Sequence, residues 1–191
     1  MMSKAHILKA IQAAKPVPCP LPVVPVFEAE TPPTREIFGS VAAQSGSRVV
    51  RAEDFVGLAT AVRTIYPKDI SIATPLRAIQ SDIDLQQASP ADLNGVDVAV
   101  IPAQLGVAEN GAVWVTEADC VHRVLPFIAQ HLVLVLPEDR IVRNMHEAYA
   151  QIKIDDTGFG VFIAGPSKTA DIEQSLVIGA QGARSLTIIL I

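Results

Sequence analysis

The chain has 191 residues, half of them hydrophobic, and it carries 15 Lys and Arg against 20 Asp and Glu, a net charge of -5. This length favours one well-buried domain, and the lack of a Lys and Arg cluster argues against a nucleic-acid partner. The longest uncharged stretches fall short of the roughly 20 apolar residues that a membrane-spanning helix needs. The first residues, MMSKAHILKAIQAAK, also lack the apolar core and cleavage site of a signal peptide. We therefore expect a cytoplasmic protein without a membrane span.

The first predicted element in chain order is a short amphipathic helix over residues 3–14, with Ser3 as its N-cap. Prolines then hold the following residues, up to residue 33, in an extended conformation. Residues 1–33 are thus predicted to be an N-terminal helix and a Pro-rich arm. The arm is either a linker or a segment that docks onto a partner.

Helical and strand-like patterns alternate in residues 34–191, which we predict to be one α/β domain. The predicted helices cover residues 35–44, 53–66 and 169–179, and the predicted strands cover residues 47–50, 69–73, 96–103, 111–117, 131–137, 158–165 and 185–191. Strands that are apolar on both faces and alternate with helices predict a largely parallel sheet in a three-layer α/β/α sandwich. Ligands of such folds bind beyond the carboxyl ends of the strands.

Cys19 and Cys120 are the only cysteines, too few for the four thiolates that an iron-sulfur cluster normally requires. We expect both to be free thiols in a reducing cytoplasm. The four histidines are scattered without the spacing of metal ligands, so no metal site is predicted.

The first candidate site is the start of the predicted helix 169–179. Ser167 or Thr169 would cap this helix, and Asp171 would complement its dipole. Lys168 fits less well, because a cation near a helix N-terminus is unfavourable unless an anion shares the site. Free amides at a helix start, a glycine at 165 and a nearby ammonium group are what a phosphate or carboxylate needs. The alternative is ordinary helix capping with an exposed lysine.

The second candidate site is the Glu109-Asn110-Gly111 sequence before a predicted strand. Asn-Gly favours a positive φ and marks a tight turn. A carboxylate on such a turn at the edge of a cleft would instead act as a nucleophile or a base. The sequence leaves both interpretations open.

The stretch GPSKTADIEQSLVIGAQGARSLTIILI, from Gly165 to the C-terminus, resembles the C-terminal signature of the lactate utilisation protein C family, which has the LUD domain. The family pattern runs Gly-Pro-Ser-Arg/Lys-Thr-Ala-Asp-Ile-Glu and later Gly-X-His-Gly-Pro. This chain departs from it at Gln181, where the family usually has His, and at Ala183, where it usually has Pro. A neutral amide does not titrate, so proton transfer by an imidazole is not carried over to Gln181.

The resemblance implies a fold similar to the sugar-phosphate isomerase and coenzyme A transferase superfold. It also implies a role in oxidation of L-lactate to pyruvate, beside partner subunits that carry iron-sulfur clusters. The chain would be a subunit without a cluster that binds a small anionic ligand, a carboxylate or a phosphate-bearing molecule. Nothing in the sequence identifies a cofactor. The residues assigned to this ligand are Gly165, Pro166, Ser167, Lys168, Thr169 and Asp171, together with Asn110, Gln181 and Gly182.

Two other functions stay open. Glu109-Asn110-Gly111 is similar to the Ser-Glu-Asn-Gly motif around the glutamate nucleophile of coenzyme A transferases, which suggests an acyl-coenzyme A transferase or a nucleotide-dependent ligase with Glu109 as the catalytic residue. The other possibility is an assembly module without chemistry, in which the first helix and the Pro-rich arm dock onto a partner.

Overall fold

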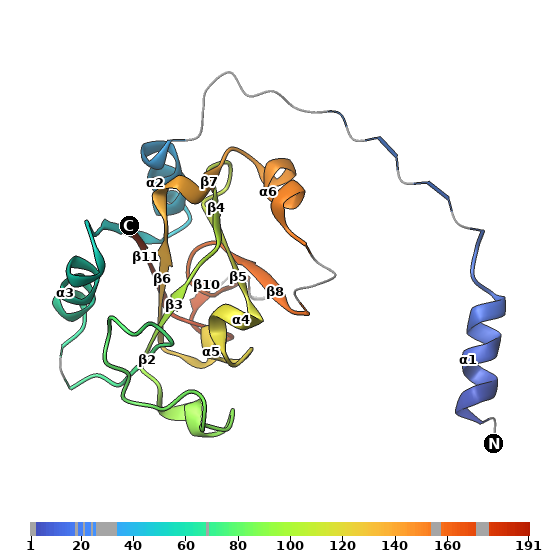
Figure 1. The fold of residues 1–191 in the computed structure, drawn as a ribbon, viewed down its shortest axis with the longest axis horizontal. Helices are drawn as coiled ribbons and strands as arrows, with labels where there is room; N and C mark the ends of the chain where they lie inside the picture. The colour runs from blue at the N-terminus through green and yellow to red at the C-terminus, as the bar shows by residue number, and fades with distance from the viewer. Residues whose placement is uncertain are drawn as a thin grey trace.

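A parallel sheet forms the centre of the computed structural model, which describes residues 3–17, 19–20, 22–23, 25, 34–67, 69–153, 158–170 and 176–191. Its strands lie in the order β1-β11-β6-β3-β2, and each neighbouring pair is parallel. The bounds are β1 Arg48–Arg51, β2 Ile72–Ala73, β3 Val98–Pro102, β6 His131–Leu136 and β11 Ser185–Leu190. Figure 1 shows this sheet edge-on beside α3. The predicted α/β class with a parallel sheet is confirmed.

Four further strands form a second sheet that the sequence analysis did not predict. Its order is β7-β4-β5-β8, with bounds β4 Leu105–Val107, β5 Ala112–Thr116, β7 Ile141–Val142 and β8 Gly160–Ile163. β5 is antiparallel to both β4 and β8. The turn at Glu109–Gly111 reverses the chain between β4 and β5, and for this reason the two strands form a hairpin instead of joining the parallel sheet.

Six α-helices and two short 3-10 helices lie among the described residues. Their bounds are α1 Lys4–Ala13, α2 Arg35–Gln44, α3 Phe55–Ile65, α4 Glu117–Cys120, α5 Leu125–Ile128, α6 Met145–Gln151, η1 Asp92–Gly95 and η2 Glu138–Arg140. α1 and α2 begin where predicted, because the Ser3 and Thr34 hydroxyls accept bonds from the N–H groups of His6 and Ile37. None of the described helices is long and apolar enough to cross a membrane.

The core is layered around the parallel sheet. Val100 and Val133 on one face pack with Leu58 and Val62 of α3. The other face packs against α2 and β5, through residues that include Ile101, Leu134, Ile188, Phe38, Val113 and Val115. Trp114 points from β5 to the far side of the second sheet, where it packs with Ala148 of α6. Helices therefore cover the outer face of each sheet.

The predicted helix over residues 169–179 is wrong for the part of it that the structure describes. β9 Lys168–Ala170 and β10 Leu176–Ile178 form an antiparallel pair in which Thr169 lies opposite Val177. Residues 171–175, and with them the predicted site residue Asp171, lie outside the described residues. β-branched residues such as Thr169, Val177 and Ile178 favour extended backbone, and a short apolar run fits either structure.

The N-terminal part of the chain differs from the rest in its burial. α2 buries Phe38 completely, whereas α1 buries none of its residues. Residues 18, 21, 24 and 26–33 of the predicted Pro-rich arm lie outside the described residues. The division of the chain at residues 33 and 34 therefore stays a prediction.

Candidate ligand-binding pocket

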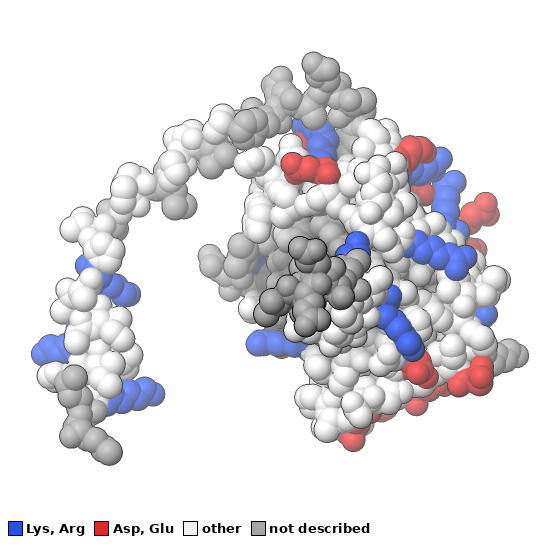
Figure 2. All heavy atoms as spheres, turned by 180° about the vertical axis from the view of Figure 1, so that it is seen from behind, with Lys and Arg blue, Asp and Glu red and all other residues white. Residues whose placement is uncertain are grey.

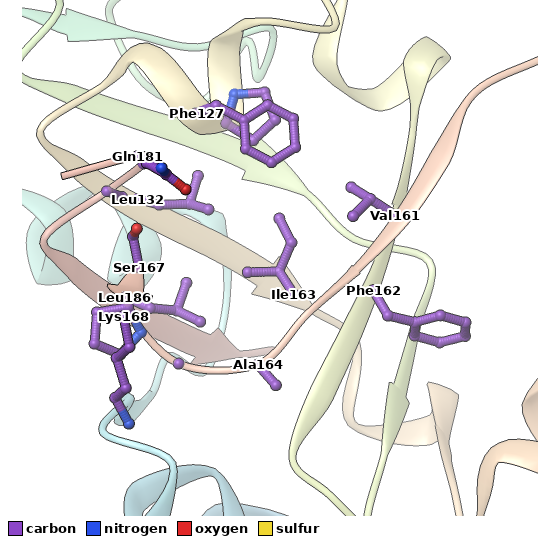
Figure 3. Close-up of a pocket in the computed structure, with 15 residues that line it drawn as sticks. Phe127, Leu132, Val161, Phe162, Ile163, Ala164, Ser167, Lys168, Gln181 and Leu186 are labelled. Carbon is purple, nitrogen blue, oxygen red and sulfur yellow. The ribbon is translucent and has the colours of Figure 1, made fainter. Parts of the chain in front are cut away.

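A cavity of about 300 Å³ lies between β8 and the starts of β6 and β11. Its apolar walls come from Phe127 of α5, Leu132 of β6, Leu186 of β11, and Val161 and Ile163 of β8. Figure 3 shows these side chains around the cavity, with Ser167 and Gln181 at one side and Phe162 pointing away from it. The pocket therefore combines an apolar interior with a neutral polar rim.

The pocket lies near the amino ends of two parallel strands, not at the carboxyl ends as the sequence analysis expected. Leu132 and Leu186 are each the second residue of their strand, and they lie side by side in the register. Ser167 is bonded to Ala183, two residues before β11 begins. This contact brings the end of the β9-β10 hairpin back to the start of β11, which places the pocket at that end of the sheet.

The backbone around Ser167 is already hydrogen-bonded within the chain. The Ser167 N–H donates to the Ala183 carbonyl at 2.8 Å, and the Ser167 carbonyl accepts from the Gly179 N–H at 2.9 Å. The Thr169 hydroxyl donates to the Val177 carbonyl at 3.3 Å. The prediction that free amides here open towards an anion at a helix N-terminus is therefore wrong.

Lys168 points away from the cavity (Figure 3). Its Nζ donates to the Ser45 carbonyl at 2.6 Å, and Ser45 is the C-cap of α2. A cation is favourable at a helix C-terminus, where carbonyl groups lack partners and the dipole is negative. The sequence analysis inferred a lysine placed unfavourably at a helix N-terminus. This placement does not exist, because Lys168 is the first residue of strand β9.

Two predicted glycines allow close packing of the chain around the pocket. Gly165 has a φ of +77°, and a Cβ there would lie 2.2 Å from the Ser45 carbonyl oxygen. A Cβ on Gly182 would lie 3.3 Å from the Ser167 Cβ. Both glycines therefore join segments of the protein to each other, which accounts for them without a bound phosphate.

The structure brings six of the predicted ligand residues together on this pocket: Gly165, Pro166, Ser167, Lys168, Gln181 and Gly182. Thr169, Glu109 and Asn110 do not line it. The apolar wall residues were missed, since their sequence pattern does not distinguish a pocket wall from an ordinary core.

Glu109 and Asn110 have structural contacts of their own. The Glu109 carboxylate accepts the N–H of Met145, the first residue of α6, at 3.0 Å. The Asn110 Oδ1 accepts the Ala112 N–H at 3.0 Å, which forms the tight turn that the sequence predicted. Glu109 thus holds the start of a helix and does not face the pocket.

Outside the pocket, the two cysteines differ in exposure, since Cys19 is exposed and Cys120 is buried. Both cysteines are free, and burial raises the pKa of the Cys120 thiol to about 12, helped by Asp119 and Glu117. Among the residues that the structure describes, no three His, Cys, Asp or Glu side chains form a group that would hold a metal ion. Figure 2 shows Lys and Arg side chains spread over that face of the molecule, several of them next to Asp or Glu side chains.

Comparison with known proteins places these features in a family. Residues 78–191 match the family model of the LUD domain. The lactate utilization protein C of Geobacillus thermodenitrificans is 27% identical over 161 residues, which cover 79% of this chain and 65% of the relative. That of Shouchella clausii is 32% identical over 92 residues, which cover 45% of this chain and 40% of the relative. The chain thus spans 40–65% of the length of these curated relatives.

One solved structure has a similar fold. The crystal structure of a DUF162 family protein from Deinococcus radiodurans superposes with a TM-score of 0.61, over 81% of this chain and 94% of that chain. The two sequences are 17% identical. At this identity the likeness concerns the fold alone.

Proposed function

Because this chain belongs to the LUD domain family, we propose that it takes part in lactate utilisation, as a cytoplasmic subunit without an iron-sulfur cluster. Its relatives named lactate utilization protein C support the pathway. Only two cysteines are present, and the pKa of one of them is about 12. Electron transfer through clusters would therefore belong to partner subunits with their own cysteine ligands.

The pocket beside β8 is the proposed site for a small organic ligand of that pathway. The observation that carries this proposal is that residues 165–168 and 181–183, both within the family signature, meet on one cavity. The Ser167 hydroxyl and the Gln181 amide offer hydrogen bonds to a carboxylate, carbonyl or hydroxyl oxygen. Leu132, Val161 and Ile163 would contact the carbon skeleton. Since Lys168 is bonded to Ser45, neutral groups would bind the polar end of this ligand.

A thermal-shift screen against lactate, pyruvate, coenzyme A, nucleotides and simple phosphates tests the ligand site. A ligand at 100 times its dissociation constant stabilises a protein by about 2.7 kcal/mol. Val161→Trp would fill the cavity and remove this stabilisation. Val56→Trp is the matched control, because Val56 lies 74% exposed on α3, outside the pocket lining. An equal ligand shift in both variants would rule out this pocket.

Growth tests the pathway separately. Deletion of the gene in its own organism should abolish growth on L-lactate and leave growth on glucose unchanged. Complementation by the wild-type chain should restore growth, and purification of that tagged chain should recover iron-sulfur proteins. Normal growth of the deletion strain on L-lactate would contradict the proposed pathway whatever the pocket binds.

A further inference from the structure

β8 forms an edge of the second sheet, since it pairs with β5 and with no other strand among the described residues (Figure 1). An edge strand presents N–H and C=O groups that another extended segment can pair with. Proteins usually protect such edges with charges, prolines or very short strands. The two larger sheets have four edges, which are β1, β2, β7 and β8. These edges differ in their protection.

Three of the four edges carry features that discourage pairing. β2 and β7 are only two residues long. β1 has an arginine at each end, Arg48 and Arg51. β8, in contrast, has four residues and lies within residues 158–167, which include no charged side chain and no proline before Pro166. Its edge is therefore open to another strand.

The hydrogen bonds between β5 and β8 determine which groups of β8 face outward. The Glu117 N–H donates to the Phe159 carbonyl at 2.9 Å, so the peptide groups of Phe159 face β5. Peptide groups of successive residues in an antiparallel strand face opposite sides. Val161 and Ile163 therefore also face β5, where they pair with two valines. The residues between them face the open side.

Gly160 and Phe162 are the residues of β8 whose N–H and C=O groups face outward. No main-chain hydrogen bond joins these groups to another described residue. The two residues lie symmetrically on either side of Val161. When two β8 strands run antiparallel with Val161 opposite itself, Gly160 of each copy lies opposite Phe162 of the other, and each such pair exchanges two hydrogen bonds. The edge is therefore complementary to itself, as a two-fold dimer interface must be.

Aromatic side chains lie beside this edge on both faces of the sheet. Phe127, which is 41% exposed, lines the candidate pocket together with Val161. Tyr149, which is 54% exposed, lines a cavity of about 450 Å³ together with Phe162 and Trp114. The cores of protein interfaces are rich in aromatic residues and poor in charged ones. The surface around β8 has this composition.

We infer that two copies of this chain form a dimer through antiparallel pairing of their β8 strands, with the two-fold axis beside Val161. The second sheets of the two copies then form one continuous sheet. Phe162 of each copy lies next to Gly160 of the other, over which the Trp114 ring packs, since a Cβ on Gly160 would lie 2.3 Å from that ring. Residues opposite each other share a face of a sheet. Both candidate pockets, each lined by Val161, therefore lie on the same face near the axis.

Sedimentation and amide hydrogen exchange of the full chain test this pairing. The wild type should sediment as a dimer at high concentration and as a monomer after dilution. In the dimer, the N–H groups of Gly160 and Phe162 should exchange about tenfold more slowly than in the monomer. Val161 and Ile163 are the internal reference, because their N–H groups face β5 in both states and should change much less.

A pair of opposite charges at position 161 tests the axis itself. Val161→Lys should prevent dimer formation, because two like charges would lie directly opposite each other. Val161→Glu should do the same. An equal mixture of the two variants should recover the dimer, since each lysine then faces a glutamate, and this recovery also shows that both variants are folded. Val56→Lys is the matched control on α3, where Val56 is 74% exposed, and it should dimerise like the wild type.

A wild-type chain that stays monomeric at every concentration would overturn the inference, even if the chain bound a different protein. Slow exchange of Gly160 and Phe162 in a monomer would also contradict it, because the edge would then be covered within one chain. A Val161→Lys dimer as stable as the wild type would show that the copies meet elsewhere. A lysine and glutamate mixture that fails to dimerise would exclude a two-fold axis at Val161.

Discussion

The Nζ of Lys168 donates to the Ser45 carbonyl at 2.6 Å, across 123 residues of sequence. This bond links the β9-β10 hairpin to the C-terminal end of α2, next to the position where Gly165 packs against the same carbonyl. One wall of the candidate pocket is therefore fixed to α2 by a charged side chain. The ammonium group of this signature lysine thus bonds α2 and does not face the cavity, although Lys168 is one of the residues that line it.

Replacement of Lys168 by Met should lower the free energy of unfolding by roughly 0.5–1 kcal/mol, because a cation at a helix C-terminus is lost. Urea unfolding measures this change. Lys9→Met on α1 is the control, since Lys9 is exposed and α1 buries no residue. Equal losses in both variants would show that the bond to Ser45 contributes nothing to stability.

The members of the pocket rim were predictable, and their roles were not. Gly165, Ser167, Lys168 and Gln181 stand out in the sequence because they belong to a recognisable signature. Their chemistry was inferred from a helix, and a helix N-terminus presents free amides where a hairpin does not. The Ser167 N–H donates to the carbonyl of Ala183, which lies 16 residues further along the chain. The spacing of residue types in the sequence does not reveal such a contact.

Gly111→Ala should destabilise the domain by at least about 2 kcal/mol. Gly111 has a φ of +67°, which costs an L-residue about 1–2 kcal/mol. A Cβ would also lie 2.6 Å from the Ala42 Cα, and backbone cannot move aside cheaply. Gly95→Ala is the matched control, because a Cβ there meets no atom within 4 Å. Thermal unfolding should separate the two variants by several degrees, and similar midpoints would contradict the close packing of the β4-β5 turn on α2.

Two substitutions of Glu109 distinguish a structural role of this residue from a catalytic one. Glu109→Ala removes the acceptor of the Met145 N–H and should cost about 1 kcal/mol, whereas Glu109→Gln keeps an acceptor and should cost less. Urea unfolding compares them. A nucleophile would instead be acylated by acyl-coenzyme A in the wild type and not in Glu109→Gln. Mass spectrometry is expected to find no acylated Glu109, and a stable adduct would restore the transferase alternative.

The fold was predictable as far as local pattern determines it. β6 is apolar after His131, β11 is apolar apart from Ser185 and Thr187, and α2 has a clear N-cap in Thr34, so these elements lie where expected. Whether β5 joined the parallel sheet or a second one depended on the chain reversal at Glu109–Gly111. The sequence showed that turn but not the short strand before it, since Leu105–Val107 is only three residues long.

Cys120 should be unreactive in the folded protein. A pKa of about 12 leaves roughly one thiolate in 10,000 at pH 8, and the side chain is fully buried. Iodoacetamide should therefore modify exposed Cys19 alone under native conditions, and both cysteines in urea. Peptide mass spectrometry reads the two sites separately. Native modification of Cys120 at the rate of Cys19 would show that the core around α4 opens readily.

His131 should make stability depend on pH. Burial lowers its pKa from the usual 6.5, with a further contribution from Arg184 and an opposing one from Asp97. Below about pH 6.5 the unfolded chain binds a proton that the folded chain resists. The free energy of unfolding contributed by this group is therefore complete above that pH, and it is lost as the pH falls towards the lowered folded pKa.

His131→Gln removes this titration. Between pH 7 and pH 5 the variant should lose less stability than the wild type, as measured by urea unfolding at each pH. His6→Gln on exposed α1 should follow the wild type. Acidic residues that titrate at lower pH change the stability of all three chains in the same way. Their contribution therefore drops out when the variants are compared. Parallel stability curves for all three chains would mean that His131, although bonded to Ser185 at 2.7 Å and packed against Tyr66, is protonated equally well in the folded and unfolded states.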